Sequence, residues 1–186
     1  MYNILGIDPG ASGAIASFKS DYVDRDINGI TACKCPKEVL DMVDIANSLS
    51  SPYFKNKQKC YAYIEQVHAM PHDGRSSLFK FGTNYGAWLG ILHCLPYVDY
   101  VIKVSPQKWM KWWEVRMGTK LPKIKKDRKN MLKFWASQCT SQKVTLYNAD
   151  AILIAMYGYF NVLEDEMTEL ENEKNKLLAE KEKLSV

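Results

Sequence analysis

Cysteine and histidine, the residues that form disulfides and bind structural zinc, are scarce in this chain of 186 residues. It has five cysteines, an odd number, and three histidines, and no pair of CxxC motifs is present. His68 and His72 have a spacing that zinc sites use, but Pro71 and Gly74 argue against a helix there. We therefore interpret all five cysteines as free thiols of an intracellular protein.

Long apolar runs are absent as well. The apolar start, residues 3–8, is only as long as a strand and is too short for a signal peptide. No segment approaches the about 20 apolar residues that cross a bilayer. The sequence predicts a protein without a membrane partner, and its 47% hydrophobic residues are ample for one globular core.

Charge is distributed unevenly along the chain, although the net charge is only +4. Residues 164–186 hold eight acidic residues and four lysines, a charge of −4. The remaining 21 basic and 13 acidic residues give residues 1–163 a charge of +8. Ten of the basic residues lie within 103–129, and such a concentration favours a polyanionic partner. A solvated basic surface without a partner is the simpler alternative.

Hydrophobic periodicity and turn residues predict an α/β protein. The first three strands are close enough in sequence to pair as an antiparallel meander, and helical segments separate the later strands. The expected strands cover 3–8, 13–19, 27–34, 60–65 and 99–104, and the expected helices cover 36–49, 77–94, 106–113, 127–137 and a last segment from about 147.

Three acids lie at the edges of apolar segments. Asp8 and Glu65 each end a predicted strand, and Asp150 opens the last helix. A carboxylate in such a place must be paired, protonated or bound to a cation. Three of them, far apart in sequence, predict one place where they meet around a divalent metal, and oxygen ligands suit Mg²⁺.

Four segments carry these acids and the basic region in a characteristic order. They are residues 7–14 (IDPGASGA), 63–71 (YIEQVHAMP), 105–109 (SPQKW) and 148–155 (NADAILIA). Over residues 1–160 this order resembles the RuvC family of Holliday junction resolvases, particularly its phage-type members.

The resemblance implies both a fold and an activity. The fold is the RNase H-like α/β arrangement over 1–162, a mixed five-stranded sheet flanked by helices, followed by a C-terminal, coiled-coil-like helical extension over 163–186. The activity is that of a structure-selective DNA endonuclease that resolves four-way (Holliday) junctions by paired nicks, working as a homodimer. The E-Q-V-x-x-M-P element favours a viral origin.

Site roles follow from the same resemblance. It implies two Mg²⁺ ions per site, replaceable by Mn²⁺, with Asp8, Glu65 and Asp150 as ligands and catalytic residues. Lys108 or Lys111 is expected to neutralise the phosphate that is cut. The family has a fourth ligand, Asp or His, one helical turn before the last acid, and this chain has neither there. Asn148 offers a carbonyl oxygen in its place.

Simpler interpretations of the three acids remain open. Asp8 fits a turn acid that accepts from backbone N–H groups between Gly10 and Gly13. Glu65 fits a salt bridge to the basic helix. Asp150 fits the acid that a helix N-terminus favours.

The missing fourth ligand also leaves a second function open, a catalytically weak or inactive protein that binds branched DNA. A third interpretation is a phosphotransferase, because residues 8–13 loosely resemble the phosphate loop of actin-like ATPases. The Lys-rich segment has no role in that interpretation.

DNA contacts are expected from the basic segment and from the loop after Glu65. Phosphate contacts position the duplex without reading its sequence, and His68 is expected to stack on an unpaired base. The predicted DNA-binding residues are His68, Arg75, Lys80, Lys108, Lys111, Lys123, Lys125, Lys126, Arg128 and Lys129.

Two surfaces are candidates for pairing with another chain. Gly82, Gly86 and Gly90 recur every four residues and make one helix face smooth enough for close approach. Leucines recur every seven residues at 163, 170, 177 and 184, which predicts a short coiled coil over 163–184 with a second copy or another protein. A solvated helix that frays is the alternative.

Overall fold

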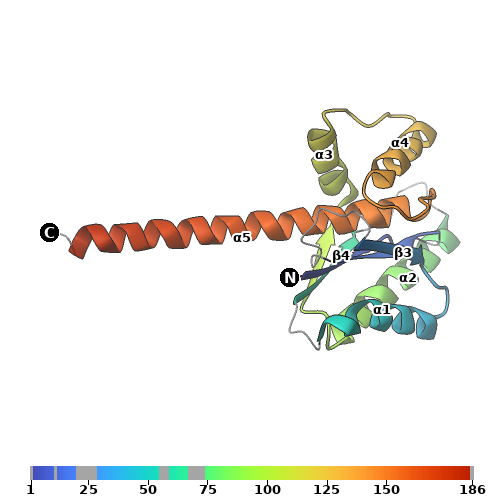
Figure 1. Ribbon diagram of the computed structural model, residues 1–186. Coiled ribbons are helices and arrows are strands. Elements are labelled where there is room, and N and C mark those ends of the chain that lie inside the picture. Colours follow the sequence, from blue (N-terminus) through green and yellow to red (C-terminus); the bar gives the residue numbers. More distant parts are fainter. Residues whose placement is uncertain (1, 11, 20–28, 55–58, 67–73, 185–186) are drawn as a thin grey trace.

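The fold is an α/β arrangement around one five-stranded sheet (Figure 1). The structure is a computed structural model of residues 1–186, and it describes all of them except 1, 11, 20–28, 55–58, 67–73 and 185–186. The strands are β1 (Tyr2–Ile7), β2 (Ala14–Lys19), β3 (Ile30–Lys34), β4 (Lys59–Glu65) and β5 (Tyr100–Val104). The helices are α1 (Val39–Phe54), α2 (Arg75–Cys94), α3 (Pro106–Met117), α4 (Lys125–Ser137) and α5 (Ala149–Leu184).

The sheet order is β3-β2-β1-β4-β5. Strands β1, β2 and β3 pair antiparallel, as the meander predicted, whereas β4 and β5 run parallel to β1. This mixed sheet, with helices on both faces, is the RNase H-like arrangement, so the predicted fold class is confirmed.

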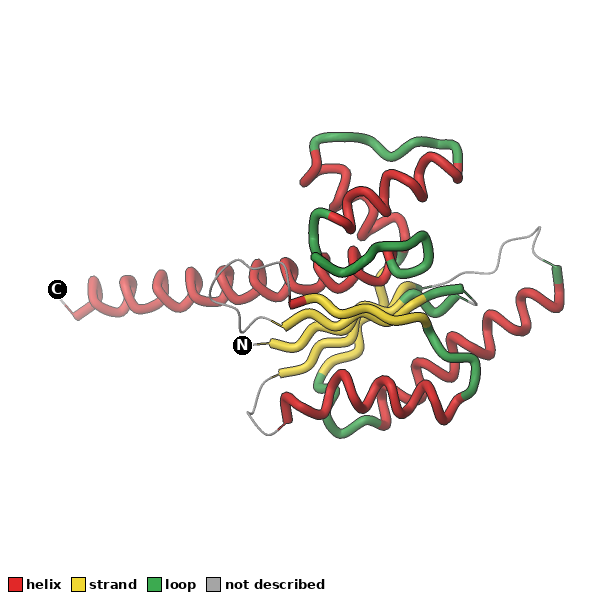
Figure 2. Tube along the Cα trace, turned by 45° about the vertical axis from the view of Figure 1, so that its right-hand side comes forward, coloured by secondary structure: helices red, strands yellow, loops and turns green. Residues whose placement is uncertain are grey.

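Helices cover the sheet in two separate layers (Figure 2). Helices α1 and α2 lie on one face, over a core that includes Leu5, Met42 and Trp88. Helix α5 lies on the other face with α3 and α4 outside it, and its core includes Ile4 and Ile152. Ile4 and Leu5 are both fully buried on opposite faces of β1, as expected for a central strand.

Helix α5 approaches the backbone of β1 unusually closely at Gly6. A Cβ atom at that position would overlap the backbone of Ala151 and Ala155. Because glycine has no side chain there, the first turns of α5 lie directly against the central strand. This contact fixes where Asp150, in the first turn of α5, lies relative to the end of β1.

Most element boundaries differ from the predicted ones by a few residues, as helix and strand ends commonly do. The largest difference is α1, predicted to end at residue 49, which continues to Phe54. Helix α3, predicted to end at Trp113, continues to Met117. Gly118 ends it in the left-handed conformation with φ 62°, where glycine is favoured. The predicted start of the third strand falls partly on 20–28, outside the described residues.

Helix α5 is continuous across residue 162, and what changes there is burial. Residues Ala151 to Ala155 are all fully buried, whereas Met167 and Leu170 are 71% and 66% exposed. The second part projects from the body as a single helix (Figure 1). Among the described residues, no helix combines the length and apolarity needed to cross a membrane. All five cysteines are free thiols.

Candidate metal site at the sheet edge

Two of the three acids lie side by side at one edge of the sheet. Glu65 is the last residue of β4, and Asp8 directly follows Ile7, the last residue of β1. The two strands are parallel neighbours, with Ile7 paired to Ile64, so both carboxylates emerge at the carboxyl end of the sheet. Asp150 reaches the same edge from the opposite direction, in the first turn of α5.

A tight turn holds Asp8. The backbone N–H of Gly10 donates to Asp8 Oδ1 at 3.0 Å, and the N–H of Gly13 donates to the Gly10 carbonyl at 2.8 Å. A Cβ atom on Gly13 would overlap the backbone of Asp8, so this position requires glycine. The interpretation of Asp8 as a turn acid is therefore correct for Oδ1, but no described residue donates to Oδ2.

Glu65 is held by a tryptophan rather than by a cation. The indole Nε1 of Trp109 donates to Glu65 Oε1 at 3.0 Å. Burial, followed by the nearby charge of Asp8, raises the pKa of Glu65 to about 8. The alternative of a salt bridge to the basic helix is not what the structure shows, because no described ion pair involves Glu65.

Asp150 has one paired and one unpaired oxygen. Its Oδ2 lies 3.3 Å from the Lys129 ammonium, whereas Oδ1 is buried and has no hydrogen-bond partner among the described residues. Burial raises the pKa of Asp150 while Lys129 opposes the shift. Burial, and to a smaller extent Asp150, also raises the pKa of Asp8. The three acids thus interact electrostatically. Their desolvation and their mutual repulsion cost free energy, which a bound cation would offset.

The donor set fits a hard divalent cation. Each of the three carboxylates keeps one oxygen that no described residue hydrogen-bonds, and oxygen donors are what Mg²⁺ prefers. Within the described part of the chain, however, no group of three His, Cys, Asp or Glu side chains is already arranged as a metal-binding cluster. The two Mg²⁺ ions, and Asp8, Glu65 and Asp150 as their ligands, therefore stay a prediction.

Asn148 has other partners than a metal. Its Oδ1 accepts from the backbone N–H of Thr145 at 2.7 Å and from the Thr145 hydroxyl at 2.9 Å. Its Nδ2 donates to the Lys143 carbonyl at 3.3 Å. These bonds close the turn that leads into α5, and they argue against the predicted role of Asn148 as a replacement ligand.

The lysine nearest the acids differs from the expected ones. Lys108 and Lys111 are exposed on α3, and Lys111 pairs with Glu114 at 3.5 Å. Lys129, on α4, contacts Asp150 instead. From the sequence, Lys129 is predicted only as a DNA contact, since linear spacing does not show which helix of the basic segment packs against the first turn of α5. Trp109 was missed for the same reason.

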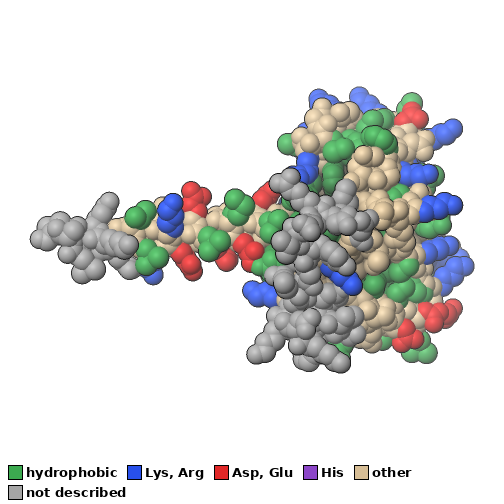
Figure 3. All heavy atoms as spheres, viewed as in Figure 1, with side chains coloured by type: hydrophobic (Ala, Val, Ile, Leu, Met, Phe, Trp, Pro, Cys, Tyr) green, Lys and Arg blue, Asp and Glu red, His purple; other side chains and the backbone are tan. Residues whose placement is uncertain are grey.

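The other predicted DNA contacts lie mostly on α3, α4 and their connection. Figure 3 shows Lys and Arg side chains over these helices and along the right-hand side of the body, and both acidic and basic side chains on the projecting part of α5. A groove of about 480 Å³ between α3 and α4 is lined in part by Lys111, Lys123 and Arg128. Lys80 is exposed on α2, and the structure describes only the backbone of Arg75. His68 and His72 lie outside the described residues.

Comparisons with known proteins give a likeness in structure but none in sequence. No family model matches the chain, and no curated protein matches its sequence. Among solved structures, RuvC of T. thermophilus in complex with a Holliday junction substrate aligns with a TM-score of 0.49 and 14% identity. The alignment covers 88% of this chain and 96% of that one. A likeness of this extent carries no argument about function, which depends here on the site itself.

Proposed function

We propose that this protein is a metal-dependent DNA endonuclease that nicks four-way junctions. One observation carries the proposal: three desolvated carboxylates, after β1, at the end of β4 and in the first turn of α5, lie close enough to interact electrostatically, and a buried oxygen of Asp150 has no donor among the described residues. A structural protein gains nothing from that arrangement, because each buried charge destabilises the fold unless a cation compensates it.

The side chains of the site have separable roles in this proposal. Asp8, Glu65 and Asp150 hold the cations, which when bound supply the charge stabilisation that phosphodiester hydrolysis needs. The turn around Gly10 and the Trp109 indole orient two of the carboxylates. Lys129 is placed to neutralise a phosphate oxygen that enters beside Asp150.

The basic helices supply the binding surface. Helices α3 and α4 border the site through Trp109 and Lys129, and their groove presents further cations. Such a surface contacts the phosphates of the DNA and makes affinity fall with salt. A homodimer would match the near two-fold symmetry of a four-way junction. Two surfaces are alternatives for this contact: the projecting part of α5, and the face of α2 with Gly82, Gly86 and Gly90, where each glycine has free space around its Cβ position.

A second function has a specific observation in its favour. Asn148 is committed to the turn before α5, and Lys129 already neutralises Asp150 in part. A protein with this arrangement could bind branched DNA without cutting it, the Lys129 ammonium taking the place of a cation.

A labelled four-way junction, incubated with the protein with and without Mg²⁺ or Mn²⁺, distinguishes the two. Paired nicks at the junction, absent with chelator and absent on linear duplex of the same sequence, are expected. Tight junction binding without nicks in either metal would contradict the nuclease and favour the binding protein. Equal binding to junction and duplex would contradict selectivity for branched DNA.

A further inference from the structure

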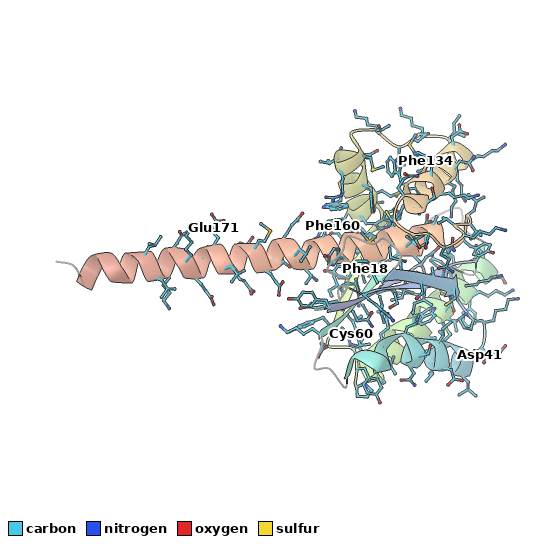
Figure 4. The ribbon with its side chains drawn as sticks, in the orientation of Figure 1. Phe18, Asp41, Cys60, Phe134, Phe160 and Glu171 are labelled. Atoms are coloured by element: carbon cyan, nitrogen blue, oxygen red, sulfur yellow. The ribbon has the colours of Figure 1, made fainter. Side chains whose placement is uncertain are left out.

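The projecting part of α5 exposes large apolar side chains that its own domain does not cover. Met167, Leu170, Leu177 and Leu178 are 71%, 66%, 59% and 51% exposed. In Figure 4, Phe160 lies where α5 leaves the body and Glu171 lies well out on the projecting helix. Most of the stability of helices in proteins comes from packing of an apolar face, so burial of these side chains against a partner would stabilise this segment.

Heptad spacing places the apolar residues on one stripe. Leucines stand at 163, 170 and 177, with 184 continuing the sequence pattern, and Met167 occupies the complementary position. A shallow groove runs along this stripe beside Leu170, Lys174 and Leu177. Phe160, one heptad before Met167, is instead covered by its own body, with the Arg116 guanidinium 3.8 Å from its ring. The uncovered stripe therefore begins after Phe160.

Charge is polarised along the same segment. Residues 164–173 contain six acids and no basic residue, whereas residues 174–184 contain four lysines and two glutamates. The first half thus carries −6 and the second half +2. Two copies side by side in the same direction would align like with like. Two copies in opposite directions bring each acidic half against the other's basic half, which stabilises the pair.

The lysines within the stripe also favour antiparallel pairing. In a parallel coiled coil, residues at one heptad position meet their own copies, so Lys174 would face the partner's Lys174. In an antiparallel pair, residues at the heptad position of Lys174 pack against residues at the heptad position of the leucines. Lys174 then lies opposite the partner's Leu170, beside acidic neighbours, and Met167 lies opposite the partner's Leu177.

From this geometry we infer that α5 docks on a second copy of the chain as an antiparallel coiled coil over residues 163–184. The segment is about 33 Å long at 1.5 Å per residue. The two bodies then lie at opposite ends of the coil. The inference is independent of the nuclease activity, because it depends only on the projecting helix.

Sedimentation of the full-length protein at micromolar concentration tests the contact. We expect the wild type to have twice the 21.3 kDa monomer mass, and the double variant Leu170→Glu/Leu177→Glu to be monomeric. The matched control, Asn172→Glu/Ala179→Glu, adds the same charge at exposed positions off the stripe and should stay dimeric. A monomeric wild type, or a dimer that survives Leu170→Glu/Leu177→Glu, would overturn the inference.

Disulfide trapping tests the direction. One chain carries Met167→Cys and a differently tagged chain carries Leu177→Cys, both with Cys94→Ser because Cys94 is exposed. Antiparallel pairing predicts that the mixture forms mainly the 167–177 disulfide after oxidation. Disulfides that join identical positions, at 167 or at 177, would show a parallel coil and contradict the inference.

Discussion

The two parts of helix α5 have the same backbone conformation but differ in burial and in charge. Its first part crosses the sheet, with Ala151 to Ala155 fully buried, and carries Asp150 to the acidic site. Its second part projects into solvent and carries an acidic half and then a basic half beside an uncovered leucine stripe.

The difference shows what keeps each part helical. Tertiary packing against β1 stabilises the first part, as the close approach at Gly6 shows. Asp165 and Glu169 of the second part still lie beside Tyr61 of β4, but Leu170 and Leu177 beyond them are largely exposed, so we expect a partner to stabilise this stretch. The four predictions that follow test this contrast, from the largest expected effect to the smallest.

The largest effect is expected for Asp8→Asn. Loss of one cation ligand should lower the junction cleavage rate on the order of 10³-fold or more, the upper range for a single electrostatic contact in a transition state. Junction affinity should be unchanged, because Asp8 is a half-buried acid and offers no positive charge to a phosphate. The control is Asp127→Asn, an exposed acid of α4. Wild-type cleavage by Asp8→Asn would remove Asp8 from the site.

Alanine substitutions at Ile152 and Leu170 compare the two parts of α5 directly. Ile152 is fully buried, so Ile152→Ala should lower the free energy of unfolding of the body by about 2–5 kcal/mol. Leu170→Ala should change it by less than about 0.5 kcal/mol, as surface substitutions do. Urea unfolding followed by tryptophan fluorescence measures the body alone, since all five tryptophans precede residue 149. Equal losses would show that the projecting part packs on the body.

Lys129→Met should slow cleavage by about 100-fold, comparable to the loss of one charge-stabilising contact. Lys111→Met is the matched control, because Lys111 is 66% exposed and pairs only with Glu114 among the described residues. Both variants lose one cation and should weaken DNA binding to a similar small extent. Single-turnover rates separate the two effects. A larger rate loss in Lys111→Met would restore the original assignment of the catalytic lysine to α3.

The smallest effect concerns stability and pH. Burial raises the pKa of Glu65 from 4.5 to about 8, so the folded protein holds a proton that the unfolded chain has lost between these values. The metal-free protein should therefore lose stability as pH rises from about 5 to 8, by an amount on the order of a few kcal/mol at most. Melting temperatures of wild type and Glu65→Gln, with chelator and with Mg²⁺, measure this.

The pH-dependent loss should be smaller in Glu65→Gln, where the titrating carboxyl is absent, and Mg²⁺ should counteract it in the wild type. A wild type whose melting temperature rises over this range relative to Glu65→Gln would mean that Glu65 is ionised and stabilised in the fold.

Local patterns were enough to predict the elements and the candidate acids. Short apolar runs bounded by turn residues predicted the five strands, and the positions of Asp8 and Glu65 at the ends of two of them predicted that the acids meet. The turn between Gly10 and Gly13 was equally readable, because its hydrogen bonds link residues only a few positions apart.

Contacts between elements could not be predicted in this way. Lys129 rather than Lys108 or Lys111 reaches Asp150, Trp109 donates to Glu65, and Asn148 bonds Thr145. The first two depend on how α3 and α4 lie against α5 and the sheet. Linear spacing carries little information about that packing.

The sequence by itself determined the strands, the helices, the three acids at their ends and the charge polarity of 164–184, because each depends on neighbours in the chain. Only the tertiary structure decided which lysine meets which acid, which carboxylate oxygen lacks a partner and where α5 ceases to be covered. Those properties arise from side chains distant in sequence that are brought together by packing on the two faces of the sheet.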